Sequence, residues 1–149
     1  TVTAWVKTTS DVTGAIIGWG PNVGGQRFGF RIDAGRIRHE HHGGNIQGDT
    51  VMNDGDWHHV AITVEPDSTV SYPQAKLWLD GLDDTRPTTD PDVYAITADL
   101  DVSIGRRPAG DDRYFIGEID ELYIYNRVLS AAEIAGQAGL TQPFDKPFD

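Results

Sequence analysis

Apolar and polar residues alternate along much of this chain in short runs, which Gly, Asn, Asp and Pro interrupt. Such alternation predicts half-buried β-strands, because successive side chains of a strand point to opposite faces. We expect strands over residues 2–7, 15–19, 28–32, 36–42, 57–64, 76–79, 102–105 and 115–126. One helix is expected over 130–138, where Ser130 and Glu133 have the spacing of a capping box. Many short strands and one short C-terminal helix predict an all-β sandwich of antiparallel sheets.

Chain length and turn residues predict one domain followed by a tail. A chain of 149 residues can bury a sizeable core, and we assign residues 1–140 to the domain. Long polar connections at 65–75 and 82–99 are expected to be loops. Residues 141–149 repeat Pro-Phe-Asp and are predicted to be a linker or tail toward a neighbouring domain. Because the chain begins at Thr1, without Met and within strand-like sequence, we expect a piece of a longer protein.

The charge of the chain argues against two classes of partner. Twenty-three acidic residues against 12 Lys and Arg give a formal net charge of −11. Such acidity disfavours nucleic acid and anionic membrane surfaces, and no apolar run approaches the length of a membrane span. Cysteine is absent, which excludes disulfides and thiol chemistry. We therefore expect neither nucleic-acid binding nor membrane insertion.

Three sequence blocks carry a resemblance to a known family. They are VTAWVK at 2–7, DGDWHHVA at 54–61 with LWLDG at 77–81, and FIGEIDELYIYNRVLSAAEI at 115–134. In this order they resemble the bacterial laminin-G-like domains of the concanavalin A-like lectin/glucanase superfamily. The resemblance implies a concanavalin A-like jelly-roll sandwich of two antiparallel sheets. It also places Trp57, His58 and His59 in the framework. A further strand that the family has before the first block has no counterpart in the printed sequence.

The functions of that family set the expected function. Its members serve as carbohydrate-binding modules, adhesion domains and appendages of secreted hydrolases. The resemblance implies a lectin-like, non-catalytic carbohydrate-binding module of a larger exported bacterial protein, secreted or on the cell surface. Its partners would be a polysaccharide or glycan and other domains of the same polypeptide. The alternatives are an adhesion or assembly module that binds protein partners or a neighbouring domain, and a small glycan hydrolase or lyase.

Glu118 and Asp120 resemble part of a catalytic motif. Retaining glucanases of the same superfamily carry a third acid on this strand, with two carboxyls about 5 Å apart across the glycosidic bond. In this chain the third acid would fall at Leu122 or Tyr123. We therefore predict that the domain is not an enzyme.

The predicted hairpin at 27–42 is rich in arginine, unlike the rest of the chain. Alternation places Arg27 with Arg31, and Arg36 with Arg38, on a shared face. Guanidinium groups bind carboxylate and sulfate in bidentate fashion. The stripe therefore predicts a site for an anionic polysaccharide. The alternative is that these arginines pair with acidic neighbours such as Asp33 and Glu40.

Histidines and aromatic residues supply further candidate ligand contacts. His39 and His41 share a face and could chelate a metal or contact a polar ligand. Trp19, beside Gly20 and Pro21, could stack on a sugar ring, as could the loop residues Tyr72 and Tyr94.

Acidic residues near the last strand predict a structural calcium site. Asp111 and Asp112 resemble the position where pentraxin and laminin-G relatives place calcium ligands, and Asp120 is a third candidate. Calcium takes six to eight oxygen ligands from several loops, so backbone carbonyls would complete the site.

Overall fold

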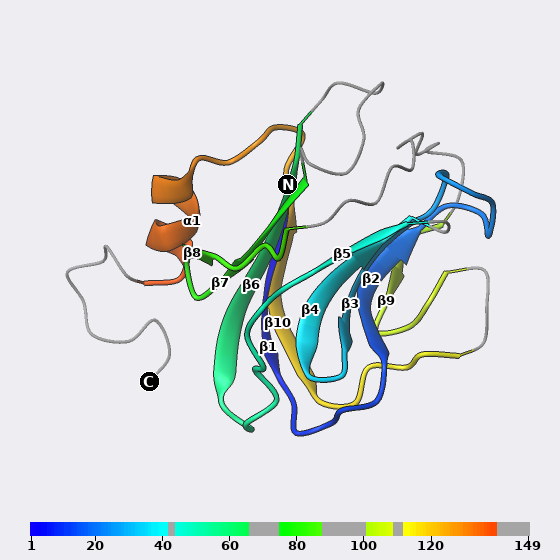
Figure 1. The fold of residues 1–149 in the computed structure, drawn as a ribbon, viewed down its shortest axis with the longest axis horizontal. Coiled ribbons are helices and arrows are strands. Elements are labelled where there is room, and N and C mark those ends of the chain that lie inside the picture. The colour runs from blue at the N-terminus through cyan, green and yellow to red at the C-terminus, as the bar shows by residue number, and fades with distance from the viewer. Residues whose placement is uncertain (42–43, 66–74, 88–100, 109–111, 140–149) are drawn as a thin grey trace.

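The computed structural model describes residues 1–41, 44–65, 75–87, 101–108 and 112–139. In these ranges it contains two five-stranded antiparallel sheets and one helix (Figure 1). The first sheet has the order β10 (Glu118–Ile124), β1 (Val2–Lys7), β6 (Trp57–Val64), β7 (Ala75–Leu79) and β8 (Leu82–Asp83). The second has the order β5 (Asn45–Gln47), β4 (Arg36–Glu40), β3 (Phe28–Asp33), β2 (Gly14–Trp19) and β9 (Ser103–Ile104). This arrangement confirms the predicted concanavalin A-like sandwich.

The core lies between the two sheets and follows the alternation of each strand. In the first sheet, Val2 pairs with Ile62, and both side chains are buried. In the second sheet, Phe30 and Ile32 of β3 enter the same core cluster. Burial of these apolar side chains stabilises the fold by about 25 cal/mol per Å² of apolar surface removed from water. The residues that alternate with these core residues along each strand face outward, and some of them form the candidate sites.

A β-bulge in the edge strand β10 departs from strict alternation. Ile119 and Leu122 both pack against the core although they lie an odd number of residues apart. The β1–β10 register shifts between Thr3 and Trp5, and Glu121 adopts a positive φ of 44°. The extra residue restores the inward direction of Leu122.

Helix α1 (Ala131–Gln137) lies on the outer side of the first sheet (Figure 1). The Ser130 side chain accepts a hydrogen bond from the Glu133 backbone, and the Glu133 side chain reaches back to Ser130, as the capping box predicts. Ile134 is fully buried against Ala61 and Trp78. No helix in the described ranges is long and apolar enough to span a membrane.

Element boundaries differ from the predicted ones mainly at the sheet edges. β5 and β8 were not expected, because two or three residues are too few to show alternation. The last predicted strand starts later, at Glu118, because the φ of 147° at Gly117 departs from strand geometry. Most of the predicted loops at 65–75 and 82–99 lies outside the described residues, as does His42, but the second predicted loop begins with the short strand β8.

Candidate functional site

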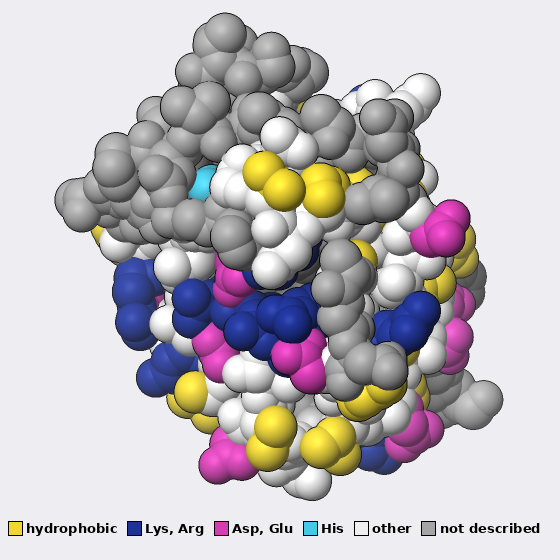
Figure 2. Space-filling model, turned by 90° about the vertical axis from the view of Figure 1, so that its right-hand side faces the viewer, with side chains coloured by type: hydrophobic (Ala, Val, Ile, Leu, Met, Phe, Trp, Pro, Cys, Tyr) yellow, Lys and Arg dark blue, Asp and Glu magenta, His cyan; other side chains and the backbone are white. Residues whose placement is uncertain are grey.

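Charged side chains gather on the outer face of the second sheet (Figure 2). We call this surface the arginine face, and it comprises Arg27, Arg31, Asp33, Arg36, Arg38, Glu40 and Arg113. The strand register pairs Arg31 with Arg38 and Asp33 with Arg36 across β3 and β4. The face that alternation predicted from the sequence is therefore present.

Glu40 is the main counter-charge of the arginine face. Its carboxylate contacts the guanidinium groups of both Arg27 and Arg31, and Arg113 Nη1 lies 3.6 Å from its Oε2. Arg27 and Arg31 are only 3% and 6% exposed. A buried guanidinium is stable only where a carboxylate and hydrogen-bond acceptors compensate its lost hydration, so Glu40 is required to keep both arginines in the sheet.

Asp33 supplies the second counter-charge. Its Oδ2 lies 2.6 Å from Arg38 Nη1 and 3.7 Å from Arg31 Nη2. Its Oδ1 accepts a hydrogen bond of 2.5 Å from the Thr13 hydroxyl. Acidic neighbours thus pair with most of these arginines, as the alternative interpretation of the arginine-rich hairpin predicted.

Pairing nevertheless leaves the arginine face positive. Five arginines against the two carboxylates of Asp33 and Glu40 leave an excess of three positive charges. Arg36 has no ion pair among the described residues. Buried nitrogen atoms of the face also lack a hydrogen-bond partner within the described part of the chain, namely Arg31 Nε, Arg36 Nη1, Arg38 Nε and Arg113 Nη1. An anionic ligand would offset the excess positive charge through the exposed parts of these guanidinium groups.

A loop closes one edge of the arginine face. Pro108 packs over Gly18 of β2, where a Cβ would lie 2.7 Å from the proline ring. Arg107 in the same loop pairs with Asp112, whose carboxylate lies 2.7 Å from its Nε. Burial lowers the pKa of Arg27. Glu40 opposes that shift, and the nearby charges of Arg107 and Arg113 add to it. The loop therefore brings further guanidinium groups to the face.

His39 and His41 share a face, as predicted, but it is the inner one. Both are fully buried on the side of β4 that faces the core. His39 Nδ1 lies 3.0 Å from the Gly29 carbonyl oxygen, and burial lowers the pKa of His39 to about 3. The two rings therefore lie behind the arginine face and not on it.

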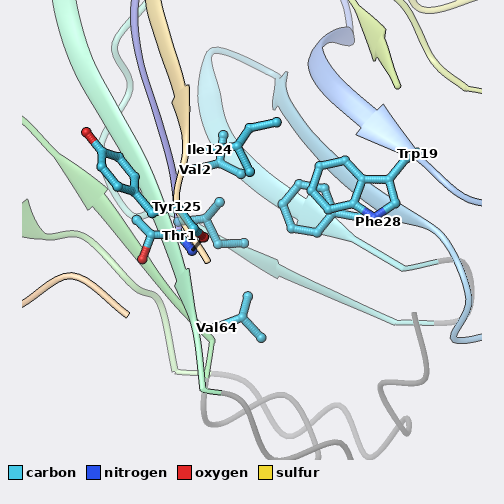
Figure 3. A pocket seen from close by; sticks show the side chains of 8 residues that line it. Thr1, Val2, Trp19, Phe28, Val64, Ile124 and Tyr125 are labelled. Carbon is cyan, nitrogen blue, oxygen red and sulfur yellow. Dashed lines mark hydrogen bonds between the residues drawn. The ribbon is translucent and has the colours of Figure 1, made fainter. Parts of the chain in front are cut away.

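Trp19 lies at one end of the sandwich and not on the arginine face. Its ring stacks on Phe28 with a centroid separation of 4.0 Å, and the two line an apolar cavity of about 180 Å³ (Figure 3). Val2 and Ile124 contribute to the opposite wall from the first sheet. Tyr72 and Tyr94 lie outside the described residues.

The predicted metal ligands do not come together in the part of the chain that the structure describes. Asp112 is engaged by Arg107, and Asp120 is exposed on β10 with its carboxylate accepting the Glu121 amide. No group of three or more acidic or histidine side chains suited to a metal occurs within the described ranges, which do not include Asp111. Glu118, the other half of the glucanase-like pair, lies 3.9 Å from Lys7 Nζ.

The sequence alone does not indicate that Arg113 joins the arginine face. The neighbouring Asp111 and Asp112 suggest a calcium site, and nothing in the local pattern shows that Arg113 reaches Glu40 of β4. A positive φ of 55° at Arg113 and the hydrogen bond from the Ala15 amide to its carbonyl place it beside the second sheet. The contact depends on tertiary structure alone.

The described residues have the same fold as several solved carbohydrate-binding structures. The CBM40 module of a Ruminococcus gnavus IT-sialidase matches with a TM-score of 0.70 and 19% identity, over 93% of this chain and 81% of that one. Domain 4 of an extracellular arabinanase from Geobacillus stearothermophilus, solved with arabinotriose, matches with a TM-score of 0.64 and 22% identity, over 92% and 65%. At these sequence identities the structural similarity shows a shared fold and nothing about function.

Longer proteins contain the same fold as one part of their chain. A leech intramolecular trans-sialidase complexed with 2,7-anhydro-Neu5Ac matches with a TM-score of 0.68 and 17% identity, over 99% of this chain but 24% of the leech chain. No curated protein sequence matches this one. Residues 1–135 match the family model Laminin_G_3, described as the concanavalin A-like lectin/glucanases superfamily. The chain therefore belongs to the Laminin_G_3 family of the concanavalin A-like lectin/glucanases superfamily.

Proposed function

We propose that this domain is a non-catalytic carbohydrate-binding module whose arginine face binds an anionic glycan. The observation that carries the proposal is the excess of three positive charges on one sheet face of a chain with net charge −11. The carbohydrate-binding modules among the structural matches support the glycan as ligand class.

The contacts within the face indicate which residues would hold the ligand. Arg27 and Arg31 are committed to Glu40 and lie deepest. Arg36 and Arg38 are more exposed, and each has a nitrogen without a hydrogen-bond partner among the described residues. Uronate carboxylates or sulfate groups would bind these two guanidinium groups, with Arg113 at the edge. The buried pair would hold the sheet face rigid beneath them.

Binding affinity for charged glycans tests this proposal. Affinity electrophoresis with polygalacturonate, heparin and a sialylated glycan should show retardation, whereas neutral dextran should not. The double variant R36A/R38A should lower the affinity at least tenfold and reduce its dependence on salt. The control is K76A, which removes one charge from an exposed side chain of the first sheet. Equal affinity of R36A/R38A and the unmodified protein would refute the assignment of the face.

The cellular setting belongs to the same proposal. We infer a module of a larger exported bacterial protein, acting outside the cell and attached to other domains. The extracellular arabinanase and the sialidases among the structural matches support that setting, because in those proteins a domain of this fold belongs to an enzyme that acts on carbohydrate. Calcium remains a proposal as well, and it rests on the sequence position of Asp111, Asp112 and Asp120, since Asp112 is paired with Arg107 and Asp111 lies outside the described residues. Glycan binding should weaken when a chelator is added, and equal binding with and without the chelator would refute a role for calcium.

A further inference from the structure

A second cavity lies on the outer face of the first sheet, beside α1, on the opposite side of the sandwich from the arginine face. Its volume is about 260 Å³. Strands β1, β6 and β10 and the end of α1 line it, and the side chains used below are Thr3, Trp5, His59, Glu121, Tyr123 and Gln137. These residues are separated by up to the full length of the domain in sequence, so only the fold brings them together.

Polar atoms in the wall of this cavity lack partners. The atoms Thr3 Oγ1, His59 Nδ1 and Gln137 Oε1 are buried without a hydrogen bond of good geometry among the described residues, and a weak contact with the Gln137 side chain raises the pKa of His59. Thr3 and His59 are 1% and 2% exposed. A buried polar atom without a partner costs about 1–3 kcal/mol, so native proteins rarely leave three in one place. The cavity holds several times the volume of about 30 Å³ that one water occupies, which leaves room for a ligand.

Neighbouring contacts fix the direction of two of these groups. Gln137 Nε2 donates a hydrogen bond of 2.7 Å to the Tyr125 hydroxyl, which leaves its Oε1 as the available acceptor. The His59 ring makes an edge contact with Trp5 at a centroid separation of 5.5 Å. Burial lowers the pKa of His59 to about 4, although the Asp80 carboxylate and a side-chain hydrogen bond with Gln137 act the other way. At neutral pH the wall therefore presents an uncharged imidazole and an amide oxygen.

The β-bulge of β10 supplies the one charged side chain of the cavity. Glu121 is the residue with positive φ at the bulge, and its side chain lines the cavity. Left-handed backbone costs a residue with a Cβ about 1 kcal/mol or more, and bulges commonly redirect a side chain toward a site. No Lys or Arg lines the described part of the cavity. The carboxylate therefore favours hydroxyl donors and disfavours an anionic ligand.

Aromatic rings complete the wall. Tyr123 is 49% exposed, and its ring lies 6.2 Å from that of Tyr125, while Trp5 lines the cavity from β1. Aromatic faces attract the C–H groups of a sugar ring, and the amide, imidazole, hydroxyl and carboxylate groups can bind its hydroxyls. The volume lies just below the range of about 300–1,000 Å³ for drug-sized ligands, so it suits one ring and not a chain.

We propose that this cavity is a second binding site, which takes a single neutral, hydroxyl-rich sugar ring through Trp5, Tyr123 and the buried polar atoms of Thr3, His59 and Gln137. It is independent of the anionic-glycan site on the opposite sheet. A domain with two such sites could hold two glycan segments, or two parts of one glycan, at once. Linked sites of this kind raise avidity without new contacts at either one.

Titration with neutral monosaccharides, followed by NMR, tests the second site. The probes are D-galactose, L-arabinose, D-glucose and N-acetyl-D-glucosamine at millimolar concentrations. At least one should shift the Trp5 indole and His59 signals in a saturable way while the arginine-face signals stay unchanged. T3V should weaken that binding about tenfold, because it removes one buried hydroxyl. T3V should also fold at least as stably as the unmodified protein, since a methyl group replaces an unpartnered hydroxyl.

Two controls separate this site from the arginine face. R36A/R38A should leave monosaccharide binding unchanged, and T3V should leave anionic-glycan binding unchanged. Absence of any saturable shift with all four sugars would overturn the proposal, and so would an unchanged affinity in T3V. Binding of tetramethylammonium in place of the sugars would overturn the ligand class, because aromatic rings with a carboxylate also suit an organic cation.

Discussion

Arg31 and Arg38 face each other as direct cross-strand partners on β3 and β4, two like charges side by side. Such a pair destabilises a sheet unless opposite charges flank it. Here Glu40 contacts Arg31 and Asp33 contacts Arg38, so the four side chains form an alternating pattern. The stability of the second sheet is therefore coupled to the charge of its candidate binding surface.

The substitution E40Q tests this coupling. It preserves the shape of the side chain but leaves Arg27 and Arg31 buried without their carboxylate. Removal of one partner of a buried ion pair costs about 3–5 kcal/mol, and we expect the free energy of unfolding to fall by about 3 kcal/mol. Denaturant unfolding measures it. D49N is the control, because its pair with Arg86 is exposed and should contribute at most about 1 kcal/mol. Equal losses in both variants would contradict the role of Glu40.

Added sulfate should show whether E40Q is destabilised by excess positive charge or by lost packing. Loss of the carboxylate raises the positive excess on the arginine face, so anions should stabilise E40Q more than the unmodified protein. Thermal unfolding in sulfate and in chloride at equal ionic strength measures this difference. A similar response of both proteins would show that the arginines do not attract anions.

Glu133 predicts an acid-sensitive helix start. Hydrogen bonds from Arg127 and from the backbone and hydroxyl of Ser130 lower the pKa of Glu133 from 4.5 to about 2. Its contribution to stability is therefore present above about pH 4.5 and is lost as the pH falls through about 2. NMR titration of the carboxyl should show a midpoint near 2. R127L should raise it toward 4.5, and a midpoint near 4.5 in the unmodified protein would contradict the capping contacts.

His58 and His59 are chain neighbours whose pKa values are shifted in opposite directions. Burial lowers the pKa of His58, but contacts with Asp80 and Asp54 outweigh burial and raise it above 6.5. Its contribution to stability is present below pH 6.5 and is lost as the pH rises through the folded pKa. Burial lowers the pKa of His59 to about 4, so its contribution is present above pH 6.5 and declines as the pH falls toward 4.

NMR titration of the imidazole signals resolves the two rings. D54N should lower the pKa of His58 and leave that of His59 unchanged, because Asp54 contacts only the former. Titration of both rings near 6.5 would contradict the burial of His59 and the ion pairs of His58.

Ile134 should anchor α1 to the first sheet. Its side chain is fully buried against Ala61 and Trp78. The substitution I134A should lower the free energy of unfolding by about 3 kcal/mol, through lost burial and the cavity left behind. A132S, at an exposed position of the same helix, should cost about 0.5 kcal/mol. A loss of similar size in both would show that α1 does not pack on the sheet.

Local pattern predicted the second sheet well and the roles of its residues only in part. Alternation correctly placed Arg36 and Arg38 on one face and His39 and His41 on the other. It did not show that the histidine face is the buried one, because Ile37 is the one apolar residue on that face within 36–41, and histidine occurs on either side of a sandwich. The bulge at Glu121 was also unforeseen, since the odd spacing of the apolar residues in β10 is resolved only by pairing with β1.

The sequence by itself determined the sandwich, the capped helix and the alternation of arginines on β3 and β4. The strands, the cap and the alternation depend on residues close in the chain, so short-range periodicity reports them. The sandwich joins distant strands such as β1 and β10, and the family resemblance indicated it. Tertiary structure alone decided that Arg113 joins Glu40, that Trp19 stacks on Phe28, and that Thr3 and Gln137 share a cavity. These contacts join distant segments, and their geometry depends on how the strands pair and how α1 packs on the first sheet.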